Sequence, residues 1–453
     1  MTTHEVDVVV LGLGPGGEHA AIKLGRAGLD VVAVDERLVG GECPYFGCVP
    51  SKMMIAAARE LDAARRVPEF GGTAEVHPDW GPVAARIRDE ATDDWDDTAA
   101  VKRLEDAGAT FVRGHGVLTG PGRVEVDGTT YAARRGVVLN TGTSPAVPPV
   151  DGLADTPYWT NRDAVRLTEL PASLAVLGGG PIGAELAQVF SRFGVRVTVV
   201  EAADRLLPND EPEAGEKLEA AFAAEGIQVL TGAAVSQVAY ADGAFTLAVG
   251  DGEVTADKLL VATGRRTHVE GIGLGVVGAT VERGVVATDE RMRAGERLWA
   301  VGDITGKGAF THVSMYQAAV AVRDVLGQDG PWADYRSVSR VTFTEPEVAS
   351  AGMSEARAHD ELPNVAVATG DLGSRGWIAK ADGLVKVVAD ADRKILVGAT
   401  VVGPTGGEVI GLLGLAIKQE VPVTELLELH YAYPTYYRAV EAALKGLLDD
   451  LGA

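Results

Sequence analysis

The chain has 453 residues, enough for two to four domains of roughly 100–200 residues each. Apolar residues make up 46% of it and charged residues 23%, which excludes a disordered chain or a coiled coil. The formal net charge of −23 disfavours nucleic acid and anionic membrane as partners. Two cysteines are too few for a disulfide scaffold or a cysteine zinc cluster.

The start of the chain and the length of its apolar stretches indicate the compartment in which the protein is expected. No stretch reaches the roughly 18 apolar residues that span a bilayer, and the polar start, Met1–Asp7, lacks the basic lead-in of a signal peptide. We therefore expect a cytoplasmic protein that acts on a small molecule, without a nucleic-acid or membrane partner. The 57 glycines and 6% aromatic residues suit an α/β protein with many tight strand-to-helix turns.

A glycine-rich turn lies between a buried strand and a helix near the start. The expected elements are a strand over Val6–Leu11, a helix over Glu18–Ala27 and a strand over Asp30–Val34. Gly12 makes the tight turn, Gly14 lets the backbone approach a pyrophosphate, and Gly17 lets helix and strand pack closely. Asp35 ends the second strand, where a carboxylate binds a ribose hydroxyl. This pattern predicts a dinucleotide site.

The same pattern recurs in the middle of the chain. Its expected elements are a strand over Leu174–Leu177, a helix over Ala184–Phe193 and a strand over Val195–Val200. Gly178, Gly180 and Gly183 occupy the glycine positions. Glu201 follows them at the spacing of the carboxylate in the first pattern. Two such fingerprints in one chain predict two nucleotide sites, for a flavin dinucleotide and a nicotinamide dinucleotide.

Glu201 also bears on the nicotinamide. A carboxylate accepts hydrogen bonds from a free ribose 2′-hydroxyl and repels a 2′-phosphate. Ala202 and Ala203 offer no cation, so the sequence favours NADH over NADPH. The alternative is that Arg205, the nearest cation, binds the phosphate.

Further elements complete the chain. Helices are expected over Ser51–Arg66, His77–Gly108 (polar, with an acidic surface), Gly406–Lys418 and Arg438–Leu451, and strands over Tyr131–Asn140, Leu298–Val301, Gly383–Ala389 and Ile395–Val402. Thr141 and Gly142 follow the strand at 131–140, and Gly264 lies in a similar turn. Gly302 and Asp303 follow the strand at 298–301. Prolines at 145, 148 and 149 indicate a domain boundary.

Cys43 and Cys48 lie five residues apart in the segment 40–52, GGECPYFGCVPSK. In an ideal helix this spacing puts their Cα atoms too far apart for a disulfide, so the pair must straddle an irregular helix start. A helix N-terminus and the nearby Lys52 lower the pKa of a thiol and favour a thiolate. This pattern indicates a redox pair, and the alternative is two buried structural cysteines.

Together these motifs resemble those of the pyridine nucleotide-disulfide oxidoreductase family of flavoenzymes, to which dihydrolipoamide dehydrogenase, glutathione reductase and mercuric reductase belong. The segment 343–347, FTEPE, is similar to the opening of the family's dimer-interface domain. The resemblance implies an α/β fold with two doubly wound, Rossmann-like dinucleotide-binding domains and a C-terminal α+β dimerisation domain. The implied boundaries are 1–149 and 267–335 for the two parts of the FAD domain, 150–266 for the NAD(P) domain and 336–453 for the dimerisation domain.

The resemblance also implies roles for single residues. Cys48 would be the flavin-proximal, charge-transfer cysteine, and Cys43 the interchange cysteine that meets substrate, in a Cys43–Cys48 redox disulfide. Lys52 would lie near the flavin and pair with Glu185. FAD would be held by Gly12, Gly14, Gly17, Asp35, Gly41, Lys52, Thr141, Gly142, Gly302 and Asp303, and the nicotinamide dinucleotide by Gly178, Gly180, Gly183, Glu201 and Gly264. The resemblance implies no metal.

The C-terminal stretch departs from the family. Members that reduce disulfides carry His-Pro-Thr there, with a Glu five residues after the His, and the partner subunit supplies this His as the acid-base group. Here Tyr433 stands in the His position and Arg438 in the Glu position. His430 is an alternative base, although no carboxylate lies five residues beyond it. Tyr436 and Tyr437 either line the substrate pocket or pack at the interface, and Arg438 either binds an anion or pairs with an acid.

The replacement of His by Tyr has a chemical consequence. Histidine, with a pKa of about 6.5, both takes and gives protons at neutral pH, whereas tyrosine, near 10, is a poor base. Reduction of lipoamide or glutathione disulfide at ordinary family rates is therefore not expected. Mercuric reductases also lack this His, but they carry a C-terminal cysteine pair that is missing here. The ketopropyl-coenzyme M oxidoreductase/carboxylase branch lacks it as well, and its Pro after the first redox cysteine is matched by Pro44.

The sequence thus predicts a homodimeric NAD(P)H:disulfide oxidoreductase that uses FAD and NADH, with NADPH as the alternative. It would reduce a small disulfide or thiol-reactive compound through Cys43, with Tyr433 of the partner subunit in place of the usual base. One alternative is a reductase of quinones or other acceptors, and another is a ketopropyl-coenzyme M carboxylase-like enzyme. A non-catalytic flavoprotein is disfavoured because the cysteines, Lys52 and Glu185 are kept together.

Overall fold

The computed structural model describes residues 2–452 and divides into two compact units. The first comprises Met1–Met53, Pro82–Ala146 and Arg265–Asp334, and the second Met54–Gly81, Val147–Gly264 and Tyr335–Ala453. The four-part division expected from the sequence stays a prediction. None of the helices within residues 2–452 combines the length and apolar composition that a membrane crossing requires.

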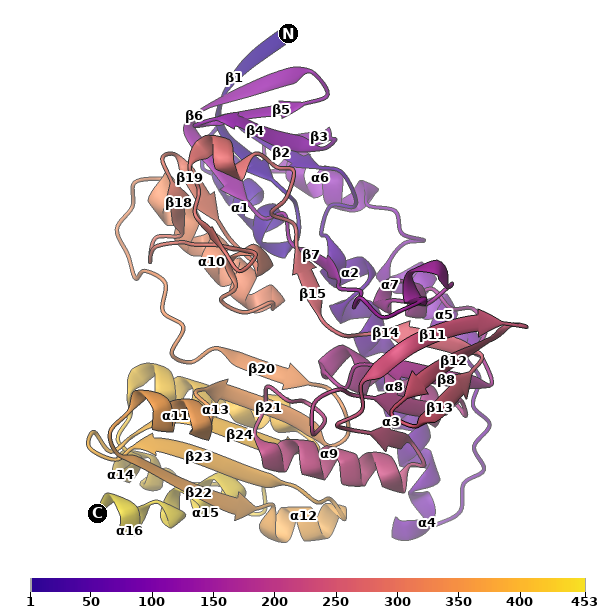
Figure 1. Ribbon diagram of the computed structural model, residues 1–453. Coiled ribbons are helices and arrows are strands. Elements are labelled where there is room, and N and C mark those ends of the chain that lie inside the picture. Colours follow the sequence, from indigo (N-terminus) through magenta and orange to yellow (C-terminus); the bar gives the residue numbers. More distant parts are fainter. Residues whose placement is uncertain (1, 453) are drawn as a thin grey trace. The chain divides into compact units, whose positions relative to one another are not determined.

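The first unit is built on a mostly parallel sheet (Figure 1). Its strands are β1 (Thr2–Leu11), β2 (Val31–Asp35), β3 (Ala109–Arg113), β4 (Gly116–Gly120), β5 (Arg123–Val126), β6 (Thr129–Leu139), β18 (Arg293–Gly295) and β19 (Leu298–Ala300). The order is β18-β19-β6-β1-β2-β3, with β1 parallel to both neighbours. The chain therefore reverses its direction of winding at β1, which is where doubly wound sheets bind ligands.

Two helices of the first unit pack side by side, α1 (Pro15–Arg26) and α10 (Thr311–Val325) (Figure 1). Their apolar side chains share one buried cluster with β1 and β2. The other elements of this unit are α2 (Glu42–Tyr45), the first part of α3 (Cys48–Arg65), α6 (Thr98–Asp106), the β7–β15 pair (Thr143–Pro145 with Arg265–Thr267) and the short β16–β17 pair (Val281–Glu282 with Val285–Val286).

The second unit contains a second parallel sheet, in the order β10-β9-β8-β14. Its strands are β8 (Ser173–Leu177), β9 (Arg196–Val200), β10 (Gln228–Leu230) and β14 (Lys258–Val261), with α8 (Pro181–Arg192) and α9 (Pro212–Ala224) as the main helices. An antiparallel sheet of β11 (Val235–Ala241), β12 (Ala244–Val249) and β13 (Gly252–Ala256) adjoins it. Here the winding reverses at β8, which precedes the second glycine fingerprint.

The C-terminal part of the second unit is an antiparallel sheet in the order β20-β21-β24-β23-β22 (Figure 1). The strands are β20 (Ser339–Thr342), β21 (Glu347–Gly352), β22 (Val365–Asp371), β23 (Leu384–Asp390) and β24 (Ile395–Gly403). The helices are α11 (Glu355–Glu361), α12 (Gly373–Ala379), α13 (Gly406–Gln419), α14 (Val423–Leu427), α15 (Tyr437–Gly446) and α16 (Leu448–Leu451). Apolar residues of α13 and α15 pack on one face of the sheet. The predicted α/β fold class with an α+β C-terminal part is confirmed.

Two of the predicted helices were wrong in extent. The segment 77–108 is not one polar helix but a series of short pieces: α5 (Gly81–Arg86), a π-helical turn (Ile87–Ala91), a left-handed turn and α6. The break follows from Thr92, whose hydroxyl donates to the Ile87 and Arg88 carbonyls and so competes with the helical backbone bonds. The predicted helix at 438–451 is likewise divided, into α15 and α16.

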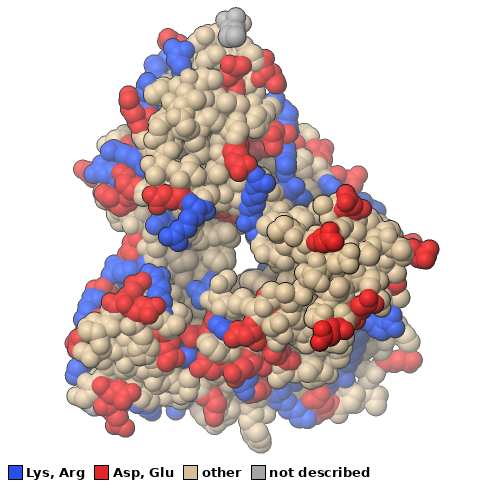
Figure 2. All heavy atoms as spheres, viewed as in Figure 1, with Lys and Arg blue, Asp and Glu red and all other residues tan. Residues whose placement is uncertain are grey.

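Acidic and basic side chains are interspersed over the face shown in Figure 2. One basic side chain is buried instead. Lys386 on β23 is 2% exposed, and its Nζ lies 2.9 Å from Glu211, 2.8 Å from Glu213 and 2.6 Å from Glu355. Burial alone lowers the pKa of a lysine, but the three carboxylates hold the pKa of Lys386 above its ordinary value. This cluster ties the start of α9 and α11 to the sheet face opposite α13 and α15.

Replacement of Lys386 by methionine is expected to lower the free energy of unfolding by about 3–5 kcal/mol, because the buried carboxylate of Glu211 loses its cation. Urea denaturation followed by circular dichroism measures this. Lys445→Met is the matched control, since Lys445 pairs with Glu441 on the surface and should cost less than about 1 kcal/mol. Equal losses in the two variants would contradict a structural role for the cluster.

Candidate functional site

The first glycine fingerprint forms the turn between β1 and α1. Gly12 has φ +88°, and a Cβ on Gly17 would lie 1.9 Å from the Gly12 carbonyl oxygen, so both positions require glycine. Asp35 closes the turn from the end of β2, where its Oδ2 accepts from the Leu13 N–H at 2.6 Å. Burial raises the pKa of Asp35. Gly14 caps α1 without a side-chain bond, and in the first turn Pro15 has no N–H. The Gly17 N–H donates to Asn140, so the helix end offers an anion its dipole and the N–H of Gly16.

The second fingerprint repeats this geometry between β8 and α8. Gly178 has φ +110°, and a Cβ on Gly183 would lie 1.9 Å from the Gly178 carbonyl oxygen. Gly180 caps α8 without a side-chain bond, and a Cβ on it would meet open space. Glu201 at the end of β9 accepts from the Gly179 N–H at 2.6 Å and from the Ala203 N–H at 2.7 Å.

Arg205, the alternative phosphate ligand, is engaged elsewhere in the same loop. Its guanidinium donates to the Pro208 carbonyl at 3.0 Å and lies 3.2 Å from the Asp204 carboxylate. The two oxygens of the Glu201 carboxylate are instead positioned by backbone N–H groups. Gly264, predicted to hold the same nucleotide, has φ +132° just after β14.

Polar side chains join the first fingerprint to the segments that follow β6 and β19. Asn140 accepts from the Gly17 N–H at 2.9 Å and donates to the Val301 carbonyl at 2.9 Å. Gln317 on α10 accepts from the Gly302 N–H at 2.6 Å. No sequence motif indicates a role for either side chain, although Asn140 directly precedes the predicted Thr141-Gly142 turn. In that turn the Thr141 hydroxyl donates to the His268 carbonyl at 2.6 Å, and Gly142 has φ +68°.

Asp303 belongs to a chain of contacts that reaches the cysteine segment. It accepts from the Thr143 hydroxyl at 2.7 Å, and Arg265 donates to that hydroxyl at 2.7 Å. The Arg265 guanidinium also lies 3.4 Å from the carboxylate of Glu42, the residue before Cys43. The structure thus brings Asp303 into one network with the start of α2.

The cysteine segment lies against the first fingerprint. Gly41 has φ +67°, and a Cβ there would lie 2.8 Å from the Gly14 Cα. The helix breaks at Phe46 and Gly47, between α2 and α3, as the spacing of the cysteines requires. Cys43 is half-buried, Cys48 is the exposed first residue of α3, and both are free thiols.

The two thiols are hydrogen-bonded to each other and ionise unequally. This bond and burial raise the pKa of Cys43. The same bond, the Thr311 hydroxyl and the charge of Lys52 lower the pKa of Cys48 to about 6. Thr311, which sequence analysis did not single out, lies 3.4 Å from the Cys48 sulfur. The reduced pair therefore holds its thiolate on Cys48 and its proton on Cys43.

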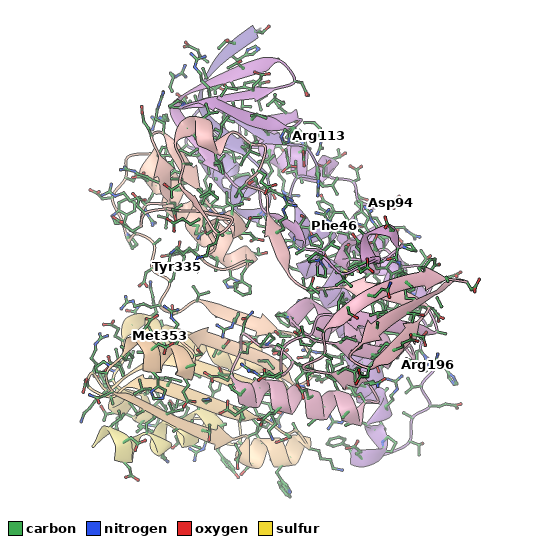
Figure 3. The ribbon with its side chains drawn as sticks, in the orientation of Figure 1. Phe46, Asp94, Arg113, Arg196, Tyr335 and Met353 are labelled. Carbon is green, nitrogen blue, oxygen red and sulfur yellow. The ribbon has the colours of Figure 1, made fainter. Side chains whose placement is uncertain are left out.

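A left-handed turn supports the cysteine segment. Asp93, Asp94 and Trp95 have φ values of +47°, +53° and +59°, a conformation that costs roughly 1–2 kcal/mol per residue. The Trp95 indole N–H donates to the Tyr45 carbonyl at 3.1 Å, between the two cysteines. Figure 3 labels Asp94 of this turn and Phe46 of the cysteine segment.

The residues after the turn hold the same segment. Asp97 accepts from the Val39 N–H at 2.7 Å and pairs with Arg113 at 2.7 Å, the latter labelled in Figure 3. No sequence motif indicated these contacts, because they join segments about fifty residues apart through backbone atoms of the cysteine segment.

Glu185 and Tyr433 lie in the second unit. Glu185 on α8 is buried and accepts from the Phe343 N–H at 2.8 Å, and its pairing with Lys52 stays a prediction. Tyr433 is 70% exposed, and its hydroxyl donates to Ser374 of α12 at 3.1 Å. His430 is exposed nearby in the sequence.

The other aromatic candidates of this stretch have structural partners. Tyr436 and Tyr437 pack against the core of the C-terminal sheet. Arg438 forms an ion pair with Glu441. These contacts favour packing for the two tyrosines and acid pairing for Arg438. Among residues 2–452, no group of three or more potential metal ligands occurs.

Two family descriptions match the chain. Residues 6–323 match "Pyridine nucleotide-disulphide oxidoreductase", and residues 338–444 match the dimerisation domain of the same family. Together the matches take in both fingerprints, both cysteines and Tyr433.

Curated proteins match over nearly the full chain. Mercuric reductase from Acidithiobacillus ferrooxidans is 35% identical, over 99% of this chain and 83% of that protein. Dihydrolipoyl dehydrogenase from Chlorobaculum tepidum is 32% identical, over 99% of this chain and 98% of that protein.

Two solved structures share the fold. LpdA from Mycobacterium tuberculosis has a TM-score of 0.85 at 26% identity, over 98% of this chain and 99% of that one. The HOCl-induced flavoprotein disulfide reductase RclA from Escherichia coli has a TM-score of 0.84 at 23% identity, over 98% and 99%.

The unequal thiols predict a specific pH dependence. In a Cys43→Ser variant, whose hydroxyl can still donate to Cys48, the ultraviolet absorbance of the thiolate is expected to rise with a midpoint near pH 6. Below this pH Cys48 becomes protonated and unreactive. The double variant Cys43→Ser/Cys48→Ser provides the baseline. A midpoint near the ordinary thiol value of roughly 8.5 would contradict the assignment.

Proposed function

Because the chain belongs to the pyridine nucleotide-disulphide oxidoreductase family, we propose that this enzyme reduces a small disulfide or thiol-reactive compound through Cys43, with electrons from NADH passed through FAD and the Cys43–Cys48 pair. The observation that carries the proposal is the polarised dithiol. One thiol has a lowered pKa and the other a raised one, next to a dinucleotide fingerprint.

The residues present fit the two cofactors of the family. Each fingerprint combines a glycine turn with φ above +80° and a helix N-terminus without a side-chain cap, the arrangement that receives a pyrophosphate. We assign FAD to the first and the nicotinamide dinucleotide to the second. When bound, FAD supplies the relay of two electrons from the nicotinamide to the cysteine pair. Gly14, Asp35 and Asp303 would hold FAD in the first unit, and Gly180 and Glu201 the nicotinamide dinucleotide in the second.

The reduced pair supplies both electrons and one of the two protons of the reaction. Cys48 takes the shared proton, and the Cys43 thiolate attacks one sulfur of the substrate, forming a mixed disulfide and releasing one thiolate. The Cys48 thiol then gives up that proton to the departing thiolate and attacks the Cys43 sulfur. This closes the Cys43–Cys48 disulfide and releases the second thiolate, which takes a proton from a nearby acid. The substrate disulfide is reduced, and the cysteine pair is oxidised.

Tyr433 of the partner subunit is suited to supply that last proton. Residues 338–444 match a dimerisation domain, and we propose a homodimer on this ground. Tyr433 is 70% exposed on the surface of its own chain. A phenol with a pKa near 10 is protonated at neutral pH, so it donates to a leaving thiolate but removes no proton from Cys43. The Cys43 proton passes instead to Cys48, along the hydrogen bond between the two cysteines.

The cysteine content bears on the substrate. Mercuric reductases are among the relatives of this chain. The sequence, however, contains only Cys43 and Cys48, which leaves a metal ion no further thiol ligands on the way to the pair. An organic disulfide or a thiol-reactive electrophile needs only the Cys43 sulfur. These compounds are therefore the substrate class we favour.

Removal of either sulfur is expected to abolish disulfide reduction. Cys43→Ser and Cys48→Ser should lower the NADH-dependent reduction of lipoamide or another small disulfide by roughly 10³-fold or more, since neither nucleophile has a substitute. Steady-state NADH oxidation measures this. Menadione reduction on the same preparations is the control, because a quinone takes electrons without the thiols. Retention of lipoamide reduction in both variants would overturn the proposal in favour of a general acceptor reductase.

Nicotinamide preference should depend on Glu201. The wild-type enzyme is expected to use NADH at least about tenfold better than NADPH, as judged by kcat/KM, because Glu201 repels a 2′-phosphate and accepts from a 2′-hydroxyl. Glu201→Gln should narrow this ratio, mainly through a higher KM for NADH. Glu253→Gln, an exposed site in the same unit, is the matched control. Equal use of both nucleotides by the wild-type enzyme would refute the assignment.

A further inference from the structure

Thr311 lies outside both fingerprints and the cysteine segment, yet its hydroxyl lies against the redox pair. Thr311 Oγ1 is 3.4 Å from Cys48 Sγ, although 263 residues separate them in sequence. Thr311 is the first residue of α10 and Cys48 is the first residue of α3. The amino ends of two helices therefore meet at one sulfur atom, and both favour negative charge there.

The hydrogen bond between Thr311 and Cys48 changes in donor and in strength when Cys48 loses its proton. With a thiol, either the hydroxyl or the S–H group can be the donor. A thiolate has no proton, so only the Thr311 hydroxyl can donate, and a hydrogen bond to an ion is roughly twice as strong as a neutral one. A disulfide sulfur, in turn, is only a weak neutral acceptor. The bond is thus strongest in the reduced, ionised pair.

We propose that Thr311 is a positioning residue that holds negative charge on the Cys48 sulfur of the reduced pair and stabilises that pair against oxidation. The inference rests on the proposed function of Cys43 and Cys48. Thr311 is half-buried, and its β-branched side chain has few rotamers, which suits it to hold a hydroxyl in place. The groups acting on the Cys48 thiol are Cys43 of α2, Lys52 and the peptide N–H of α3, and Thr311 of α10. The Thr311 hydroxyl and the charge of Lys52 also lower the pKa of Cys43, so both groups favour negative charge on the pair.

Two consequences follow for measurable properties. Loss of the hydroxyl should raise the pH at which Cys48 ionises. It should also make the Cys43–Cys48 disulfide harder to reduce, because a reduced form that loses stabilisation lowers the reduction potential of the pair. A purely structural Thr311 would change protein stability but neither of these properties.

The test uses the holoenzyme carrying Cys43→Ser, in which the thiolate absorbance of Cys48 is titrated with pH. Thr311→Val keeps the shape and removes the hydroxyl, and it should move the midpoint upward by about one pH unit, a tenfold change in the ionisation equilibrium. Thr311→Ser restores the hydroxyl and should leave the midpoint within about 0.3 units. An unchanged midpoint in the valine variant, or equal shifts in both variants, would overturn the inference.

A second measurement uses the enzyme with both cysteines, equilibrated with dithiothreitol. Thr311→Val should lower the reduction potential of the pair by about 30 mV, which is a tenfold change for two electrons, and Thr311→Ser should not. An unchanged potential in the valine variant would also count against the inference. If the wild-type chain forms no Cys43–Cys48 disulfide, the proposed function fails, while the titration above still decides the role of Thr311.

Discussion

A single break in a helix governs the chemistry of this chain. Five residues of unbroken helix would separate the Cα atoms of Cys43 and Cys48 by about 7.5 Å along the helix axis alone, beyond the usual reach of a disulfide. The break at Phe46 and Gly47 brings the two thiols within hydrogen-bonding contact instead. It also makes Cys48 the first residue of α3, where the helix favours a thiolate. Proximity and unequal ionisation thus have one structural cause.

The surroundings of the break keep it in place. On one side, Gly41 contacts the glycine turn of the first fingerprint so closely that a Cβ would not fit. On the other, Trp95 of a left-handed turn holds the Tyr45 carbonyl, and Asp97 holds the Val39 N–H just before the segment. That turn is strained, and its persistence indicates that the contacts around it outweigh the strain. The dinucleotide turn and the cysteine pair are therefore packed together and support each other.

The sequence predicts the main parts of the site, and the contacts that it does not predict have a feature in common. The two fingerprints and the cysteine segment are local patterns, in which residue type and spacing determine the turn. Thr311, Trp95 and Gln317 act across the fold, and only the tertiary structure brings each to its partner. The error at 77–108 is of another kind. Its polar composition is typical of a surface helix, but the Thr92 hydroxyl competes with the backbone and ends the helical turns.

The unequal thiols and the tyrosine at position 433 fit together chemically. A histidine in the partner subunit would take the Cys43 proton in one direction and return it in the other. Tyrosine gives a proton readily and accepts one poorly, so in the proposed reaction it would assist only the release of thiol products. The step it cannot assist, removal of the Cys43 proton, falls to Cys48, whose sulfur already accepts that hydrogen bond. On the function we propose, a chain with this pair and with tyrosine at position 433 would therefore be better suited to reducing a substrate than to oxidising a dithiol.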